Sequence, residues 1–112
     1  MKERHFQALC LRAIRTRNYR IRIRIIRYLR IYAEDAGNCF KIQAQRSQSP
    51  DERKWALFCL SMLGFRNARE VVWESLMDIN RSVRSMAALN AHLYDDPELS
   101  NTIDRMIKSK LL

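Results

Sequence analysis

Glycine and proline are nearly absent from this chain, with two residues of each among 112. Proteins built from many short strands need frequent tight turns, and these two residues supply the backbone conformations of such turns. Leu, Ile, Ala, Arg, Met and Glu, which favour or tolerate helices, are abundant instead. The composition therefore argues against a β-sandwich or barrel and predicts an all-helical protein, and the length of 112 residues fits a single domain.

Cysteine is scarce as well, and the three residues Cys10, Cys39 and Cys59 form no CxxC pair. An odd number of cysteines argues against a disulfide framework. No apolar run approaches the length of a membrane span, and arginines interrupt the N-terminal segment where an export signal would need an apolar stretch. We therefore predict reduced, mostly buried thiols in a cytoplasmic protein.

Residues that could carry catalysis are few. The two histidines, His5 and His92, belong to no metal-binding spacing, and two glycines cannot supply a phosphate-binding loop or a nucleophile elbow. Cys10 could act as a nucleophile only beside a base that lowers its pKa, and its apolar register favours a place in the core. The sequence predicts a non-enzymatic protein without a cofactor or metal site.

A period of 31 residues is the clearest internal pattern. A shift by this length brings Arg53 onto Arg84 and Ala56 onto Ala87, and a second shift places Arg22 and Ile25 at the same two positions. The pattern extends to apolar positions of the following helices: Phe6, Cys10 and Ile14 align two periods before Ala68, Val72 and Leu76.

The stretch from Leu76 to Leu89 resembles HEAT-like helical repeats of the PBS-lyase type. In these repeats an apolar helix ends near Asp (here Asp78), a short turn containing Asn follows, and Val-Arg opens a helix with small residues facing inward. The resemblance implies a short right-handed α-solenoid of about three hairpins with a leading half-repeat. The implied units are 1–17, 18–48, 49–79 and 80–112.

Seven helices are predicted, at 3–16, 18–33, 37–46, 50–63, 67–78, 81–94 and 97–110. Ser49-Pro50 and Asp96-Pro97 combine an N-cap with proline at the first helical position, and Gly64 suits a helix end. Residues 19–25 alternate strictly between polar and apolar, which is typical of a strand. We favour a helix there, because Ile21, Ile25, Leu29 and Tyr32 continue a helical stripe beyond the alternation.

The segment 37–46 departs from the repeat pattern. Lys41 and Gln45 occupy positions at which the other units carry apolar residues, and the Asp found at 78 is replaced by Ser47 and Thr16 in the earlier units. Irregular packing is therefore expected around this helix.

Positive charge is concentrated in the N-terminal half. Residues 1–49 contain 12 basic and 3 acidic side chains, a net charge of +9, whereas residues 50–112 contain 9 of each. In the helix predicted at 18–33 and directly before it, Arg17, Arg20, Arg24 and Arg27 are spaced to form one basic stripe opposite the apolar stripe. Guanidinium groups suit phosphate, and no acid lies between Arg4 and Glu34. The residues predicted to contact a polyanion or acidic partner are Arg12, Arg15, Arg17, Arg20, Arg24, Arg27 and Arg30.

A solvated, solubilising helix face explains the same stripe equally well. We exclude Arg22, Arg53 and Arg84 from it, because their period of 31 predicts structural bonds to turn carbonyls or to a carboxylate such as that of Asp78.

Protein binding is the other predicted function. The second helices of HEAT-like hairpins usually line the concave surface, and Trp, Arg and Met are enriched at interfaces. The predicted interface residues are Arg69, Glu70, Trp73 and Met77, accompanied by Glu74. Trp73 could equally pack against the next hairpin, and the open ends of a helical stack could support self-association.

We rank a protein partner first and nucleic acid second. The HEAT-like DNA glycosylases are a remote alternative, since they combine an acidic residue with aromatic ones over DNA. The residues of suitable type here are Trp55, Trp73, Asp78 and Asp104. Fold resemblance alone does not assign that activity.

Overall fold

A computed structural model of the chain describes residues 3–112. Within these residues every regular element is helical and there is no strand, as predicted. None of the described helices has the length and apolar character needed to cross a bilayer. The elements are α1 (Glu3–Arg15), α2 (Tyr19–Leu29), the 3-10 turn η1 (Arg30–Tyr32), α3 (Ala33–Arg46), α4 (Pro50–Leu63), α5 (Arg69–Leu76), α6 (Arg81–Asn90), the 3-10 turn η2 (Ala91–Leu93) and α7 (Pro97–Lys108).

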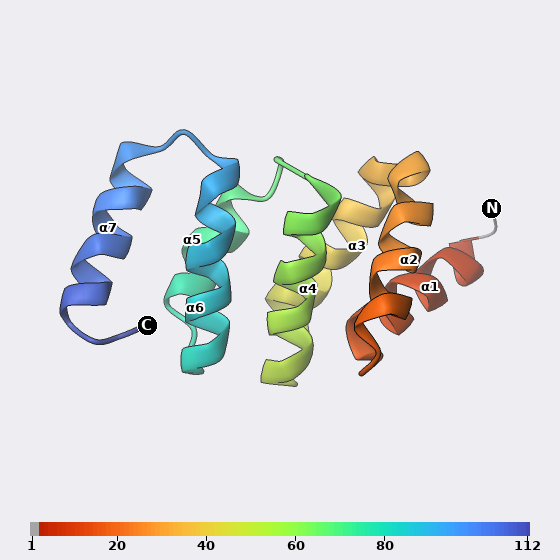
Figure 1. Cartoon of the computed structure of the whole chain (residues 1–112), viewed down its shortest axis with the longest axis horizontal. Coiled ribbons are helices and arrows are strands. Elements are labelled where there is room, and N and C mark those ends of the chain that lie inside the picture. Colours follow the sequence, from red (N-terminus) through yellow and green to blue (C-terminus); the bar gives the residue numbers. More distant parts are fainter. Residues whose placement is uncertain (1–2) are drawn as a thin grey trace.

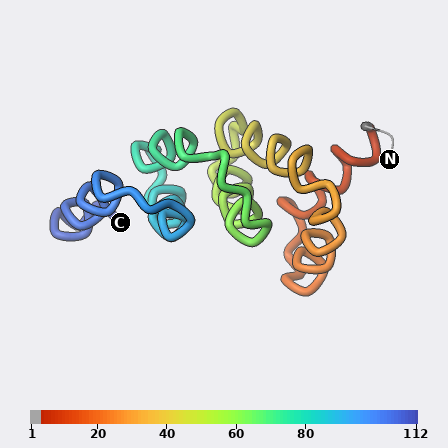
Figure 2. Tube along the Cα trace, turned by 90° about the horizontal axis from the view of Figure 1, so that it is seen from above, coloured from red at the N-terminus to blue at the C-terminus, as the bar shows by residue number. Residues whose placement is uncertain are grey.

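The molecule measures 44 × 26 × 24 Å, and the helices follow one another along its longest axis. Figure 1 shows α1 and α2 at one end and α7 at the other, with α4 central. Viewed from above, α2, α4 and α6 lie side by side in one row, and α1, α3 and α5 lie in a second row behind it (Figure 2). The core fills the space between the two rows, so each helix buries one face and exposes the other.

The alternating segment 19–25 is helical, and the strand alternative is wrong. Asn18 caps α2, since its side chain accepts hydrogen bonds from the backbone N–H groups of Arg20 and Ile21 at 3.0 and 3.2 Å. Ile25, Ile26 and Leu29 are buried, and Arg20, Arg24 and Arg27 are exposed, whereas Arg22 is the one buried arginine of α2. The helix thus brings Ile25, Ile26 and Leu29 to the side that faces the core, whereas a strand would place the adjacent Ile25 and Ile26 on opposite faces.

The helix predicted at 37–46 begins earlier, at Ala33. Its first turn contains Glu34 and Asp35, whose charges suit a helix N-terminus. Its buried face is formed by Ala36, Gly37, Phe40 and Ala44, while Gln45 is exposed and Lys41 only partly buried. The buried positions, Phe40 and Ala44, therefore each precede by one residue the positions at which apolar residues were expected, Lys41 and Gln45. The other helices start within two residues of their predicted positions.

The turns that precede α2, α4 and α6 share one hydrogen-bond pattern. Residues 18, 49 and 80 are N-caps, and the side chain two residues before each cap accepts a hydrogen bond from the cap's backbone N–H. The N-caps are Asn18, Ser49 and Asn80, and the residues that bond them are Thr16, Ser47 and Asp78. The same local structure thus recurs three times at a spacing of 31 residues.

The three arginines at this spacing have the predicted structural role. Arg22 donates to the carbonyl oxygens of Ala13, at 2.8 Å, and Thr16. Arg53 donates to Ser47 O at 2.8 Å and binds both carboxylate oxygens of Asp78, at 2.8 and 3.0 Å. Arg84 donates at 2.8 Å to Asp78 O and at 2.9 Å to Leu111 O. Each guanidinium therefore joins the start of its helix to the preceding turn.

The two glycines serve different purposes. Gly64 ends α4 in the left-handed conformation, with φ of 72°, as predicted for a helix end. Gly37 permits a close approach instead, because a Cβ atom there would lie 2.2 Å from the ring of Phe65. The connection after α4 thus packs directly onto the backbone of α3.

Candidate polyanion-binding surface

The spacing of three arginines in α2 places them together on its outer face. Arg20, Arg24 and Arg27 are separated by four and three residues, so they lie on one side of the helix, and all are exposed. Ile25 and Leu29 hold the opposite side in the core. The structure therefore presents three guanidinium groups in a row along a helix of about 16 Å.

The remaining predicted arginines extend this row onto the neighbouring segments. Arg12 and Arg15 belong to the last turn of α1, Arg30 follows α2, and all three are exposed. Arg17 is exposed but lies in the turn before the N-cap, so the prediction that it continues the helical stripe is wrong. We call the following residues together the arginine surface: Arg12, Arg15, Arg17, Arg20, Arg24, Arg27 and Arg30.

Two members of the arginine surface are held by protein groups at its border with α4. Arg15 Nε lies 3.2 Å from Glu52 Oε2, and Arg30 donates to Met62 O at 3.3 Å. Within residues 3–112, the side chains of the other five make no hydrogen bond or ion pair with protein groups. Five guanidinium groups are thus available to an external anion.

Exposed tyrosines lie on both flanks of the arginine surface, a feature that the sequence interpretation missed. Tyr28 is 49% exposed and lines a groove of about 460 Å³ between α1 and α2, together with His5, Ala8, Leu9 and Arg12. We call this the α1–α2 groove. Tyr19 is 56% exposed, and its ring lies 6.0 Å from that of Phe58. The four-residue spacing of Arg24 and Tyr28 could have revealed the first of these neighbours.

Acidic side chains limit the arginine surface on one side. A second groove, of about 430 Å³, lies where the α1–α2 turn meets the start of α4, and both Asp51 and Glu52 line it. Arg15, Arg17 and Tyr19 line the same groove. The electrostatic field is therefore strongest away from α4, over the outer faces of α1 and α2.

Arg22 lies on the same helix but has no part in this surface. It is 3% exposed, and its guanidinium carbon lies 3.8 Å from the centre of the Trp55 ring. Burial lowers the pKa of Arg22, an effect that the nearby Cys59, Asp51 and Tyr19 oppose. Its carbonyl and ring contacts compensate for the lost hydration, so Arg22 stabilises the α1–α2 turn.

The predicted protein interface on α5 is only partly open. Arg69 Nε is hydrogen-bonded to Asp96 Oδ2 at 2.6 Å, and Trp73 is partly buried against the core. Glu70 is exposed, and Met77, which follows α5, is 66% exposed. Of the four residues, one therefore serves the connection to α7, one packs inward, and two remain available.

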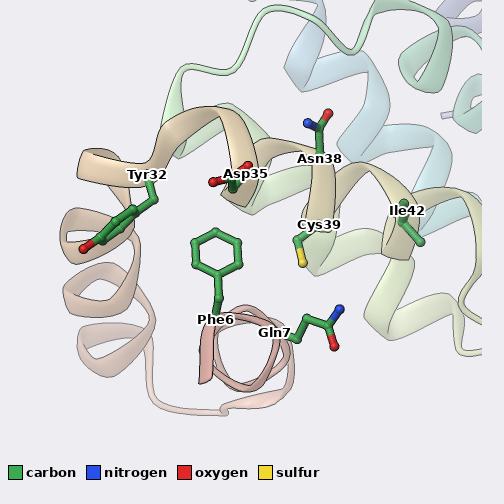
Figure 3. Close-up of a pocket in the computed structure, with 7 residues that line it drawn as sticks. All are labelled: Phe6, Gln7, Tyr32, Asp35, Asn38, Cys39 and Ile42. Atoms are coloured by element: carbon green, nitrogen blue, oxygen red, sulfur yellow. The ribbon is translucent and has the colours of Figure 1, made fainter. Parts of the chain in front are cut away.

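A groove of about 510 Å³, which we call the α1–α3 groove, separates α1 from α3 (Figure 3). Phe6 and Tyr32 form an edge-to-face pair at one side, with ring centres 6.1 Å apart, and Cys39 and Ile42 lie toward the other. Asp35 is its only charged side chain. This groove contains no arginine and is therefore chemically separate from the arginine surface.

Cys10 and Asp78, which were considered for catalysis, are buried or bound by other protein groups. A hydrogen bond with Cys39 and then burial raise the pKa of Cys10 far above its ordinary value, and burial raises the pKa of Cys59 to about 12. Arg53 occupies both carboxylate oxygens of Asp78. Among residues 3–112, no group of three His, Cys, Asp or Glu side chains is placed to hold a metal ion.

Comparison of the chain with models of protein families, with curated proteins and with solved structures finds no match. Function must therefore be inferred from the geometry of the described surfaces.

Proposed function

We propose that this protein is a non-enzymatic binding module built on HEAT-like helical repeats, and that its arginine surface binds the phosphate backbone of a nucleic acid. The repeat assignment is supported by the turn pattern that recurs at 31-residue spacing before α2, α4 and α6. Binding is supported by one observation above all: five exposed guanidinium groups without protein partners lie over α1, α2 and their connecting turn.

This proposal reverses the order of partners inferred from sequence. The arginines predicted to bind an anion are all exposed, whereas Arg69 and Trp73 on α5 are engaged by the protein itself. Lining up five cations on a small surface also costs repulsion energy, which a bound polyanion would remove. Guanidinium groups offer paired donors that match phosphate oxygens.

Salt dependence of binding tests the proposal directly. Neutralising about four phosphates predicts a slope of about −3.6 for duplex DNA in a plot of log K against log salt, and about −2.8 for single strands. The measurement is a titration of fluorescently labelled oligonucleotides between about 50 and 200 mM salt.

Two variants of equal charge make this test specific. Replacing Arg12, Arg20, Arg24 and Arg27 by Gln removes four charges from the arginine surface. The matched control replaces four other exposed cations by Gln, namely Arg46, Arg66, Arg105 and Lys108. We expect the first variant to lose most of its binding and most of its slope, and the control to retain both. Equal losses in the two variants would reduce the effect to net charge and contradict a defined site.

A protein partner is the second candidate, favoured by a separate observation. Met77 is 66% exposed and Ile79, two residues later, is 93% exposed, so two large apolar side chains project from the turn between α5 and α6. A docked protein would cover them with little dependence on salt. Binding of a partner that is lost in Met77→Ser/Ile79→Ser and preserved in the arginine variant would support this candidate.

A further inference from the structure

The α1–α2 groove has the chemistry of a site for a planar ring. Leu9 and Ala8 supply apolar contact, Tyr28 supplies an aromatic face, His5 adds a polar group able to bond a ring edge, and Arg12 adds a cation at the border with the arginine surface. Its volume of about 460 Å³ falls within the usual range of small-ligand sites, roughly 300–1,000 Å³. A ring entering it would lie beside the guanidinium row, because Arg12 belongs to both features.

Tyr28 is held in place without being covered. Its ring centre lies 6.2 Å from that of Tyr32, in a tilted contact that restrains it, while 49% of the residue is exposed. Arg24 lies one helical turn before it, so a guanidinium group and an aromatic ring are neighbours on the surface of α2. An exposed aromatic ring beside cations can stack on a flat ring of a ligand while the cations bind the ligand's negative charges.

We infer that the α1–α2 groove accepts an unpaired nucleobase, which stacks on Tyr28 while Arg12, Arg24 and Arg27 bind the adjoining phosphates, so that the protein prefers single-stranded nucleic acid. This inference rests on the proposed function and specifies its ligand. In a duplex the faces of each base are covered by neighbouring pairs, so only an unpaired strand can offer one to a tyrosine. Tyr19, 56% exposed at the start of α2, provides a second stacking surface on the other flank.

Substitution of Tyr28 separates stacking from electrostatic attraction. Stacking of one base on an aromatic side chain contributes about 1–3 kcal/mol, so Tyr28→Ala should weaken binding of an oligothymidylate of about ten nucleotides by about 5- to 150-fold. Tyr28→Phe keeps the ring and should bind nearly as tightly as the parent protein. The salt slope should stay the same in both variants, since no cation is lost.

Two ligands complete the experiment. An abasic strand of the same length has the phosphates without the rings, and a duplex has its rings covered. Neither should distinguish Tyr28→Ala from the parent protein. Circular dichroism confirms that each variant is folded, and Ile31→Ala, which removes another large side chain that is 77% exposed, controls for lost surface area.

The outcomes distinguish this inference from the proposal beneath it. Equal affinity of Tyr28→Ala and parent protein for the oligothymidylate, with steep salt dependence preserved, would overturn base stacking and leave phosphate binding intact. An equal loss on all three ligands would also overturn it, because the tyrosine would then act through the fold or the phosphates. Absence of binding to every ligand at about 50 mM salt would overturn the proposed function itself.

Discussion

At the scale of single residues, the Arg53 side chain connects three parts of the molecule. From α4, it bonds the carbonyl oxygen of Ser47 in the preceding turn and both carboxylate oxygens of Asp78 in the turn after α5. Both side chains are nearly buried, at 13% and 12% exposure, so solvent screens this pair weakly. Arg15 and Glu52 form a contrasting pair in which the arginine is 59% exposed.

The buried pair predicts a specific acid sensitivity. Burial alone would raise the pKa of Asp78, but hydrogen bonds from Arg53 and from the Asn80 N–H, with the charges of Arg53 and Arg84, outweigh it and hold the pKa below its ordinary value. A lowered folded-state pKa stabilises the fold above the unfolded-state pKa, and this contribution is lost as pH falls through the folded-state value. We expect Asp78→Asn to lower the free energy of unfolding by about 2 kcal/mol at neutral pH.

Urea unfolding at about pH 7 and about pH 2.5 checks this prediction. The difference between parent and variant should shrink at the lower pH, because the contribution of the Asp78 charge is lost as pH falls from the unfolded-state pKa toward the lowered folded-state pKa. A difference that persists unchanged would show that the charge of Asp78 contributes nothing. Glu52→Gln is the control, and it should cost less than about 1 kcal/mol at either pH.

The cysteines should differ in reactivity. The thiolate is the reacting form, and the pKa values of the buried Cys10 and Cys59 are raised. Cys39 is only partly buried and faces the α1–α3 groove (Figure 3). We expect iodoacetamide to modify Cys39 first in the native protein, as read by peptide mass spectrometry. Equal rates at all three thiols would contradict the described packing.

At the scale of elements, the packing of α3 depends on a missing side chain. A methyl group on Gly37 would overlap the buried ring of Phe65, so either the ring or α3 must move. We expect Gly37→Ala to destabilise the protein by about 1–3 kcal/mol, although alanine is the better helix former. Thermal unfolding measures this, and a stabilised variant would show that the contact does not exist.

Gly64→Ala provides a comparison with a different physical cause. No atom lies within 4 Å of a Cβ at this position, so the cost there comes only from φ of 72°. Asn tolerates this conformation better than Ala does. We therefore expect Gly64→Asn to recover stability relative to Gly64→Ala.

Most helices could be predicted from sequence because their ends carry explicit signals. Ser49-Pro50, Asp96-Pro97 and Gly64 each fix a boundary through a bond or backbone angle that one residue type favours. The start of α3 has no such signal, since Tyr32 makes no side-chain cap and the chain bends there after a 3-10 turn. The arginine row could also be predicted, because spacing alone places residues on one face of a helix.

The grooves could not be predicted in the same way. The α1–α2 groove joins residues 5–12 to Tyr28, and its shape depends on how far α1 and α2 approach each other. The pairing of Arg69 with Asp96 likewise depends on where α7 begins relative to α5. Distances between helices arise from side-chain packing across the whole core, which no local pattern records.

At the scale of the whole molecule, the net positive charge is concentrated at one end of an elongated structure. The helices extend along a 44 Å axis, and the half of the chain with net charge +9 forms α1, α2 and α3 at one end (Figure 1). The remaining half is neutral in sum. An anionic partner should therefore be attracted to one end of the molecule and bind there, with the α5 and α7 end left free.

Location of binding is thus the central claim, and solution NMR measures it most directly. In arginine side-chain Nε–Hε spectra recorded during titration with a short oligonucleotide, we predict the largest shifts at Arg12, Arg20, Arg24 and Arg27. The buried Arg22 and the distant Arg81 and Arg105 should change little. Shifts concentrated at Arg81 and Arg105, or spread evenly over all exposed arginines, would contradict a binding site on the arginine surface.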